Sequence, residues 1–119
     1  MTEIQNPKRY DLEDRTLKFA KRAMQYANSL PKNLSNIETA RQLIRSSGSI
    51  GANYIEANES LSKKDFVMRI KISRKEAKET KYWLNLTDVD HSLKDEKDAL
   101  IQECTELMKI FGAILEKSK

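Results

Sequence analysis

Four stretches of the chain repeat apolar residues at steps of three and four, which is the period of an amphipathic α-helix. They predict helices over residues 12–29, 36–60, 63–86 and 96–117. The links between these stretches are short and polar, so consecutive helices should be antiparallel neighbours. We therefore expect one all-α domain over residues 1–119, an up-and-down antiparallel four-helix bundle.

The start of each helix is predicted from a side chain that can accept a hydrogen bond from the first free backbone N–H groups. The expected N-caps are Asp11, Ser35, Ser62 and Asp95. Ser35 and Ser62 are followed three residues later by Glu38 and Asp65, the spacing of a capping box. Pro31 is expected to end the first helix, because proline cannot continue it.

The middle of the second helix, Ser46–Ala52, is poor in helix-forming residues. It contains two glycines, each of which costs about 1 kcal/mol relative to alanine. One interpretation is a loop that splits the helix. The other is a continuous helix whose small residues let a neighbouring backbone come close. The apolar stripe of this helix, which includes Ile44, Ile50, Tyr54 and Leu61, keeps its phase through the segment and favours the continuous helix.

The composition places few limits on function but several on location. The chain of 119 residues has a single cysteine, Cys104, which cannot form an internal disulfide and suits a reducing compartment. No apolar run approaches the roughly 18 residues of a membrane span. The first ten residues lack the apolar stretch of a secretory signal. We therefore expect a cytoplasmic protein with no membrane contact.

The positive charge is concentrated in two segments. The formal net charge is +4, but residues 62–84 hold eight basic and three acidic residues (+5), and residues 7–30 hold six and three (+3). At 100° per residue, the third helix gathers six basic side chains on one side. This basic face consists of Lys64, Lys71, Arg74, Lys75, Lys78 and Lys81. The acids of the same helix lie outside this sector, which leaves the cations without intrahelical partners. Either the face binds phosphates, through contacts that do not read sequence, or it is an ordinary solvated surface.

A further side of the third helix carries apolar residues that a monomer does not need. Met68, Ile72 and Trp83 lie there, outside the predicted core stripe, together with Glu76 and Glu79. Tryptophan is enriched at the centres of protein interfaces. We expect these three apolar residues to lie at a contact between subunits of an oligomer. The alternative is rim packing against a loop.

No set of residues predicts catalysis, a cofactor or a metal. His91 is the only histidine, and Asp88–His91 is expected to be a solvated turn. Cys104 lies on the core stripe, where a buried thiol is inert. The carboxylate pairs Glu56/Glu59 and Glu76/Glu79 lack the Glu-x-x-His spacing of di-metal bundles and should be surface acids. We expect a protein that is not an enzyme.

Several motifs together resemble a known family. They are Ser49–Ala57, Ser62–Phe66 and Lys75–Leu84, with support from Arg9–Glu13 and Leu30–Lys32. The chain resembles the bacterial four-helix-bundle proteins encoded in intervening sequences of 23S ribosomal RNA genes. These proteins are related to the accessory variability proteins of diversity-generating retroelements.

The resemblance implies a ring oligomer, commonly a homopentamer, with basic surfaces for nucleic acid. It also implies a continuous second helix and supplies no catalytic residues. Two functions follow as hypotheses. One is an oligomeric accessory protein that binds RNA or DNA through phosphates. The other is a protein–protein scaffold, an adaptor for a neighbouring enzyme such as a reverse transcriptase.

Overall fold

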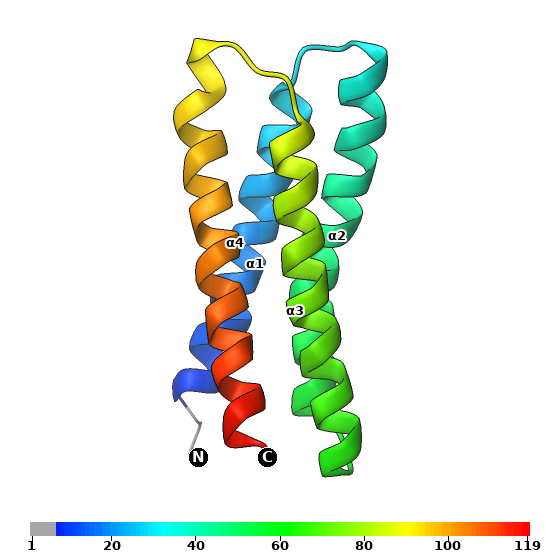
Figure 1. Ribbon diagram of the computed structural model, residues 1–119, viewed down its shortest axis with the longest axis vertical. Coiled ribbons are helices and arrows are strands. Elements are labelled where there is room, and N and C mark those ends of the chain that lie inside the picture. The colour runs from blue at the N-terminus through cyan, green and yellow to red at the C-terminus, as the bar shows by residue number, and fades with distance from the viewer. Residues whose placement is uncertain (1–6) are drawn as a thin grey trace.

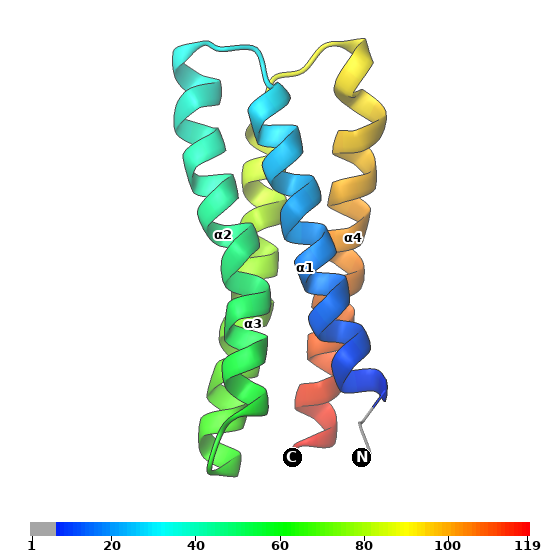
Figure 2. The same cartoon turned by 180° about the vertical axis from the view of Figure 1, so that it is seen from behind.

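The computed structural model describes the backbone of residues 7–119 and the side chains of residues 11–119. It contains four helices, α1 (Pro7–Ser29), α2 (Leu34–Asn58), α3 (Lys63–Leu86) and α4 (His91–Lys117). Consecutive helices run in opposite directions, with α3 and α4 in front in Figure 1 and α1 and α2 in front in Figure 2. The predicted all-α four-helix bundle is confirmed.

The predicted start of α3 is confirmed, whereas that of α2 is wrong. The Ser62 hydroxyl accepts a hydrogen bond from the Asp65 backbone N–H at 3.1 Å. In α2 the N-cap is Asn33, whose Oδ1 accepts from the Asn36 N–H at 2.8 Å. Ser35 donates its own hydroxyl to Asn33 at 3.0 Å instead of capping. Asparagine and serine are equally good caps, so neighbouring candidates cannot be ranked from sequence.

The starts of α1 and α4 were both predicted too late. The first helix begins at Pro7, which suits a first helical position because it has no N–H to satisfy, and Asp11 lies inside the helix. The fourth begins at His91, because Asp90 accepts a hydrogen bond from the Ser92 N–H at 3.0 Å. Asp95 therefore lies inside α4. In the first turn of α4 only Leu93 is apolar and half-buried, and a single residue does not define a period.

The second helix is continuous through its glycines, as predicted. Gly51 marks a close approach to α1, since a Cβ at this position would lie 2.8 Å from the Thr16 hydroxyl oxygen. A Cβ at Gly48 would meet nothing within 4 Å. The two glycines thus have different environments, and only Gly51 is required by the packing of the bundle.

The core runs along the whole bundle and draws residues from all four helices. Its largest fully buried apolar side chains are Phe19, Tyr26, Leu43, Ile50, Ile70, Leu84, Leu100, Leu107 and Phe111. All of these except Tyr26 lie on the apolar stripes that the helical period predicts for the four helices. Two stripe residues of α2 were wrong, since Ile44 is 36% exposed and Leu61 is fully exposed. Leu61 follows the end of α2 at Asn58, so the helical phase no longer applies to it.

A set of hydrogen bonds from one buried side chain joins the α1–α2 link to the α3–α4 link at one end of the bundle. The side-chain amide of Asn36 donates to the carbonyls of Pro31 and Asp88, at 3.0 and 3.1 Å, and its Oδ1 accepts from the Asp88 N–H at 3.1 Å. The hydroxyls of Tyr26 and Thr87 share a hydrogen bond of 2.6 Å nearby. These bonds fix where α3 ends and α4 begins, and so hold α3 in register with its neighbours.

Candidate nucleic-acid interface

The basic face lies along the solvent side of α3. The helix is anchored on its other side by a row of fully buried residues, Ile70, Ala77 and Leu84, at seven-residue intervals. Lys64, Lys71 and Lys78 repeat at the same interval and are exposed. Because seven residues are about two turns, both rows run nearly parallel to the helix axis. The structure thus brings the predicted basic residues together on one side of one helix.

Five of these six cations have no carboxylate partner among the side chains of residues 11–119. Arg74 and Lys75 are exposed like the three lysines above, and Lys81 is half-buried. Among the described side chains, Lys75 alone of the six lies within 4.0 Å of a carboxylate oxygen. Its Nζ is 3.7 Å from Glu76 Oε2, so the expectation that no cation of this face has an intrahelical partner is wrong for Lys75.

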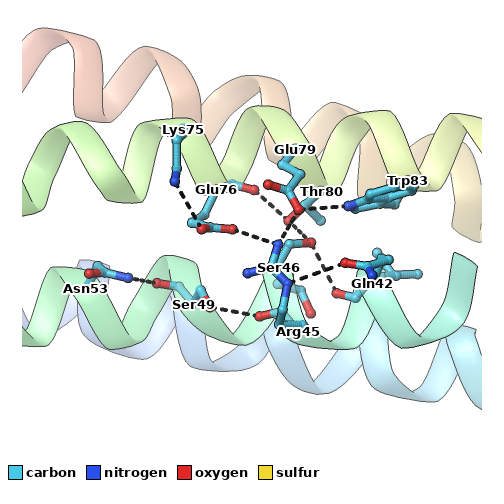
Figure 3. Close-up of polar contacts among 12 residues, drawn as sticks. Gln42, Arg45, Ser46, Ser49, Asn53, Lys75, Glu76, Glu79, Thr80 and Trp83 are labelled. Atoms are coloured by element: carbon cyan, nitrogen blue, oxygen red, sulfur yellow. Dashed lines mark hydrogen bonds and ion pairs between the residues drawn. The ribbon is translucent and has the colours of Figure 1, made fainter.

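Glu76 is a buried acid, which corrects its prediction as a surface residue. It is 6% exposed and lies between α3 and α2, where its Oε1 is 3.5 Å from the Arg45 guanidinium (Figure 3). A buried carboxylate without such a counter-charge is costly. Two cations, Arg45 from α2 and Lys75 from α3, therefore compensate its charge. Glu56 and Glu59 are exposed, as predicted.

A second acid of α3 links the same network to the aromatic residues. Glu79 forms an ion pair with Arg45 and accepts a hydrogen bond from the Trp83 indole N–H at 3.0 Å (Figure 3). The bond from Trp83, together with the charge of Arg45, lowers the pKa of the Glu79 carboxyl. Glu79 therefore stays ionised and holds the indole ring in place.

The three predicted interface residues differ in their surroundings. Trp83 is half-buried and packs against the core, and not against a loop as the alternative interpretation expected. Met68 is 45% exposed and Ile72 is half-buried. Both line a shallow groove on the outer side of α3 together with lysines of the basic face, among them Lys64 and Lys71. Their contact with another subunit stays a prediction.

Sequence reasoning missed a further apolar edge between α1 and α2. Ile37 and Ile44 of α2 line a groove with Ala27 of α1 and Leu30 of the α1–α2 link, and both isoleucines remain exposed. Exposed apolar residues continue along both helices, at Leu17, Met24 and Ile55. Ile44 was expected in the core. The width of the apolar stripe on α2 was the signal in the sequence that could have revealed this edge. The neighbouring helix does not cover the outer side of that stripe.

Tyr82 is the second feature that the sequence analysis passed over. It is 58% exposed, and it is the one exposed aromatic side chain among residues 11–119. It follows Lys78 by four residues and Lys75 by seven, so it lies on the same side of α3 as the basic face. This spacing was readable from the sequence.

The remaining candidate groups are a buried thiol and an exposed imidazole. Cys104 is buried, and burial raises the pKa of its thiol to about 12, which keeps it protonated. His91 is the exposed first residue of α4. Within the described part of the chain, no three metal-binding side chains cluster, and no helix has the length and hydropathy of a membrane span.

The fold and its surface define a small antiparallel four-helix bundle with one strongly basic helix. The profile of the 23S rRNA-intervening sequence protein family matches residues 8–113. The chain belongs to this family. It is similar to a crystal structure from Bacteroides thetaiotaomicron, of a protein with unknown function from the S23 ribosomal protein family. The TM-score is 0.76 at 30% identity, over 92% of this chain and 98% of that chain. No curated protein matches it.

Proposed function

We propose that this protein is a non-enzymatic, oligomeric accessory protein that binds RNA or DNA through backbone phosphates. The observation that carries the proposal is a row of cations on α3 that have no carboxylate partner in the described part of the chain, Lys64, Lys71, Arg74, Lys78 and Lys81. At 1.5 Å per residue the row is about 25 Å long. Solvated surface lysines are common, but cations in a monomer usually have acids interspersed among them. Here a single sign covers one side of a helix and attracts polyanions.

The character of these side chains favours phosphate contacts over base readout. Lysine ammonium groups act as mobile point charges, and Arg74 is the single guanidinium of the face. Such contacts position a nucleic acid without reading its sequence. Each phosphate that a cation neutralises releases condensed counterion, so log affinity should fall linearly with log salt. A ring of subunits would repeat the face and add avidity. We expect the protein to act in the cytoplasm.

Charge reversal on the basic face tests the proposal. The variant Lys71→Glu, Arg74→Glu, Lys78→Glu leaves Lys75 intact, because Lys75 compensates the buried Glu76. We expect it to abolish binding to mixed-sequence RNA and DNA, measured by fluorescence anisotropy over a salt series. The wild type should show a slope of roughly −0.7 to −0.9 per phosphate contact. Circular dichroism should show unchanged helicity.

A matched control separates the face from net charge. The variant Lys21→Glu, Lys32→Glu, Lys117→Glu makes the same charge change at exposed lysines outside α3. It should retain most of the binding. Equal losses in both variants would show that only the total charge matters. Absence of any salt-sensitive wild-type binding at low ionic strength would refute phosphate binding altogether.

Self-association is the second part of the proposal and has its own test. We expect light scattering to show a closed oligomer, with a pentamer as the family-based expectation. Ile72→Glu, on the groove of α3, should release smaller species while helicity persists. Leu61→Glu, at a fully exposed position in the α2–α3 link, is the control and should leave the assembly unchanged. A wild-type protein that stays monomeric at high concentration contradicts the assembly.

The exposed apolar edge between α1 and α2 favours a second candidate function, a scaffold or adaptor for another protein. Edges of this kind mark protein contacts in soluble proteins. A reverse transcriptase encoded beside this gene would be the partner to test. Co-purification of that enzyme with the wild type, and its loss in Leu17→Glu, would support the scaffold. The scaffold becomes the better explanation if the basic face binds no nucleic acid.

A further inference from the structure

Tyr82 places an exposed aromatic ring within the basic face. Its side chain is 58% exposed, one helical turn beyond Lys78 and two beyond Lys75. The other aromatic side chains among residues 11–119 are buried or half-buried. A single exposed tyrosine is common on a protein surface and needs no explanation by itself. What distinguishes Tyr82 is its position at one end of the basic face, one helical turn beyond Lys78.

The ring of Tyr82 is also supported from one side. It meets Trp83 edge-on, with ring centroids 5.1 Å apart and planes at 73°. Trp83 in turn packs against the core and donates its indole N–H to Glu79, which is paired with Arg45 of α2. A ring that a neighbouring side chain already holds in place loses little conformational freedom when a ligand covers its other face. The arrangement therefore offers a preformed flat surface beside phosphate-binding cations.

We propose that Tyr82 is a stacking platform for an unpaired base, so that the preferred ligand of the basic face is single-stranded nucleic acid. This inference rests on the proposed phosphate binding and makes it more specific. Non-specific single-strand binders combine cations that follow the backbone with aromatic rings on which bases stack. In a duplex the bases are stacked on each other and cannot reach a ring on a convex helix surface. Duplexes thus bind through phosphates alone.

Binding to matched oligonucleotides tests the platform. The probes are a mixed-sequence RNA strand of about 12 nucleotides, its duplex, and a strand of equal length with abasic residues. We expect Tyr82→Ala to weaken binding of the single strand by roughly 5- to 150-fold. Duplex binding should be unchanged. Tyr82→Phe keeps the ring and should bind like the wild type, whereas Tyr82→Leu keeps apolar area without the aromatic face and should bind like Tyr82→Ala.

The abasic strand shows whether the loss comes from a base. It keeps the phosphates and removes the stacking partner, so the wild type should bind it as weakly as Tyr82→Ala binds the normal strand. Combining Tyr82→Ala with the abasic strand should cause no further loss. Leu17→Ala removes a similarly exposed apolar side chain from α1, which packs against α2 and α4, and should leave binding unchanged.

The outcomes separate this inference from the proposed function. Salt-sensitive wild-type binding that is equal for single strand, duplex and abasic strand would overturn the platform and leave phosphate binding standing. A Tyr82→Ala variant with wild-type affinity for the single strand would do the same. Loss of duplex binding in Tyr82→Ala would show a structural role instead of stacking. If the wild type binds none of the three probes, the proposed function itself fails.

Discussion

Phe111→Ala is expected to lower the free energy of unfolding by about 3–5 kcal/mol, the usual cost of truncating a buried aromatic residue. Phe111 is completely buried in α4 and meets the Tyr54 ring of α2 at a centroid distance of 5.9 Å. Truncation would leave a cavity between helices that are not consecutive in the chain. Urea denaturation followed by circular dichroism, with an unchanged m-value, measures the loss.

Two further truncations, at a half-buried and at an exposed position, give stability changes with which this loss can be compared. Phe66 is only half-buried, at the edge of the core, so Phe66→Ala should cost clearly less than Phe111→Ala. Leu61 is fully exposed, and Leu61→Ala should change stability by less than about 0.5 kcal/mol. A loss below about 1 kcal/mol for Phe111→Ala would mean that α4 is packed in a different rotation about its axis.

Gly51→Leu should destabilise the protein by about 1–3 kcal/mol or more, although leucine is the better helix former. Even a Cβ at this position would lie 2.8 Å from the Thr16 hydroxyl oxygen and 3.1 Å from the Thr16 Cβ. Thr16 is itself buried and bonded through its hydroxyl to the Leu12 carbonyl at 2.9 Å, so it cannot swing aside freely. The helices α1 and α2 would have to move apart.

Gly48 is the matched control, three residues earlier in the same helix. Its position has open space around it, so Gly48→Ala should raise stability by about 1 kcal/mol through helix propensity alone. Thermal and urea denaturation of both variants would measure the contrast. A stabilised Gly51→Leu would place residue 51 on the surface and contradict the close approach to α1.

The proposed basic site lies next to an acid, Glu76, that is buried in the bundle. Glu76 pairs with Lys75, whereas among the described side chains the other five cations of the basic face have no carboxylate partner. Glu79 and Trp83 then connect the α2–α3 contact to the ring of Tyr82. We therefore expect substitutions at Lys71, Arg74 and Lys78 to change the proposed binding without changing the fold, and substitutions at Lys75 and Glu76 to affect both.

The sequence by itself determined the number of helices, their order and most of the core. Apolar residues such as Ile70, Leu84 and Phe111 recur with the helical period, and a stripe of that period must face other apolar surface to leave water. The start of α3 carries a local signal, the Ser62 cap. The basic face was also readable, since residues of one helix keep fixed angular positions whatever their neighbours are.

Only the tertiary structure decided how neighbouring helices divide the remaining surface. Whether Glu76 is buried depends on Arg45, which comes from another helix 31 residues earlier in the chain. Whether Gly48 or Gly51 is needed depends on which of them faces Thr16. Whether Ile44 is covered depends on how far α1 reaches across α2. Each of these is a contact between residues distant in sequence, and helical periodicity does not say which residue of one helix lies opposite which residue of the next.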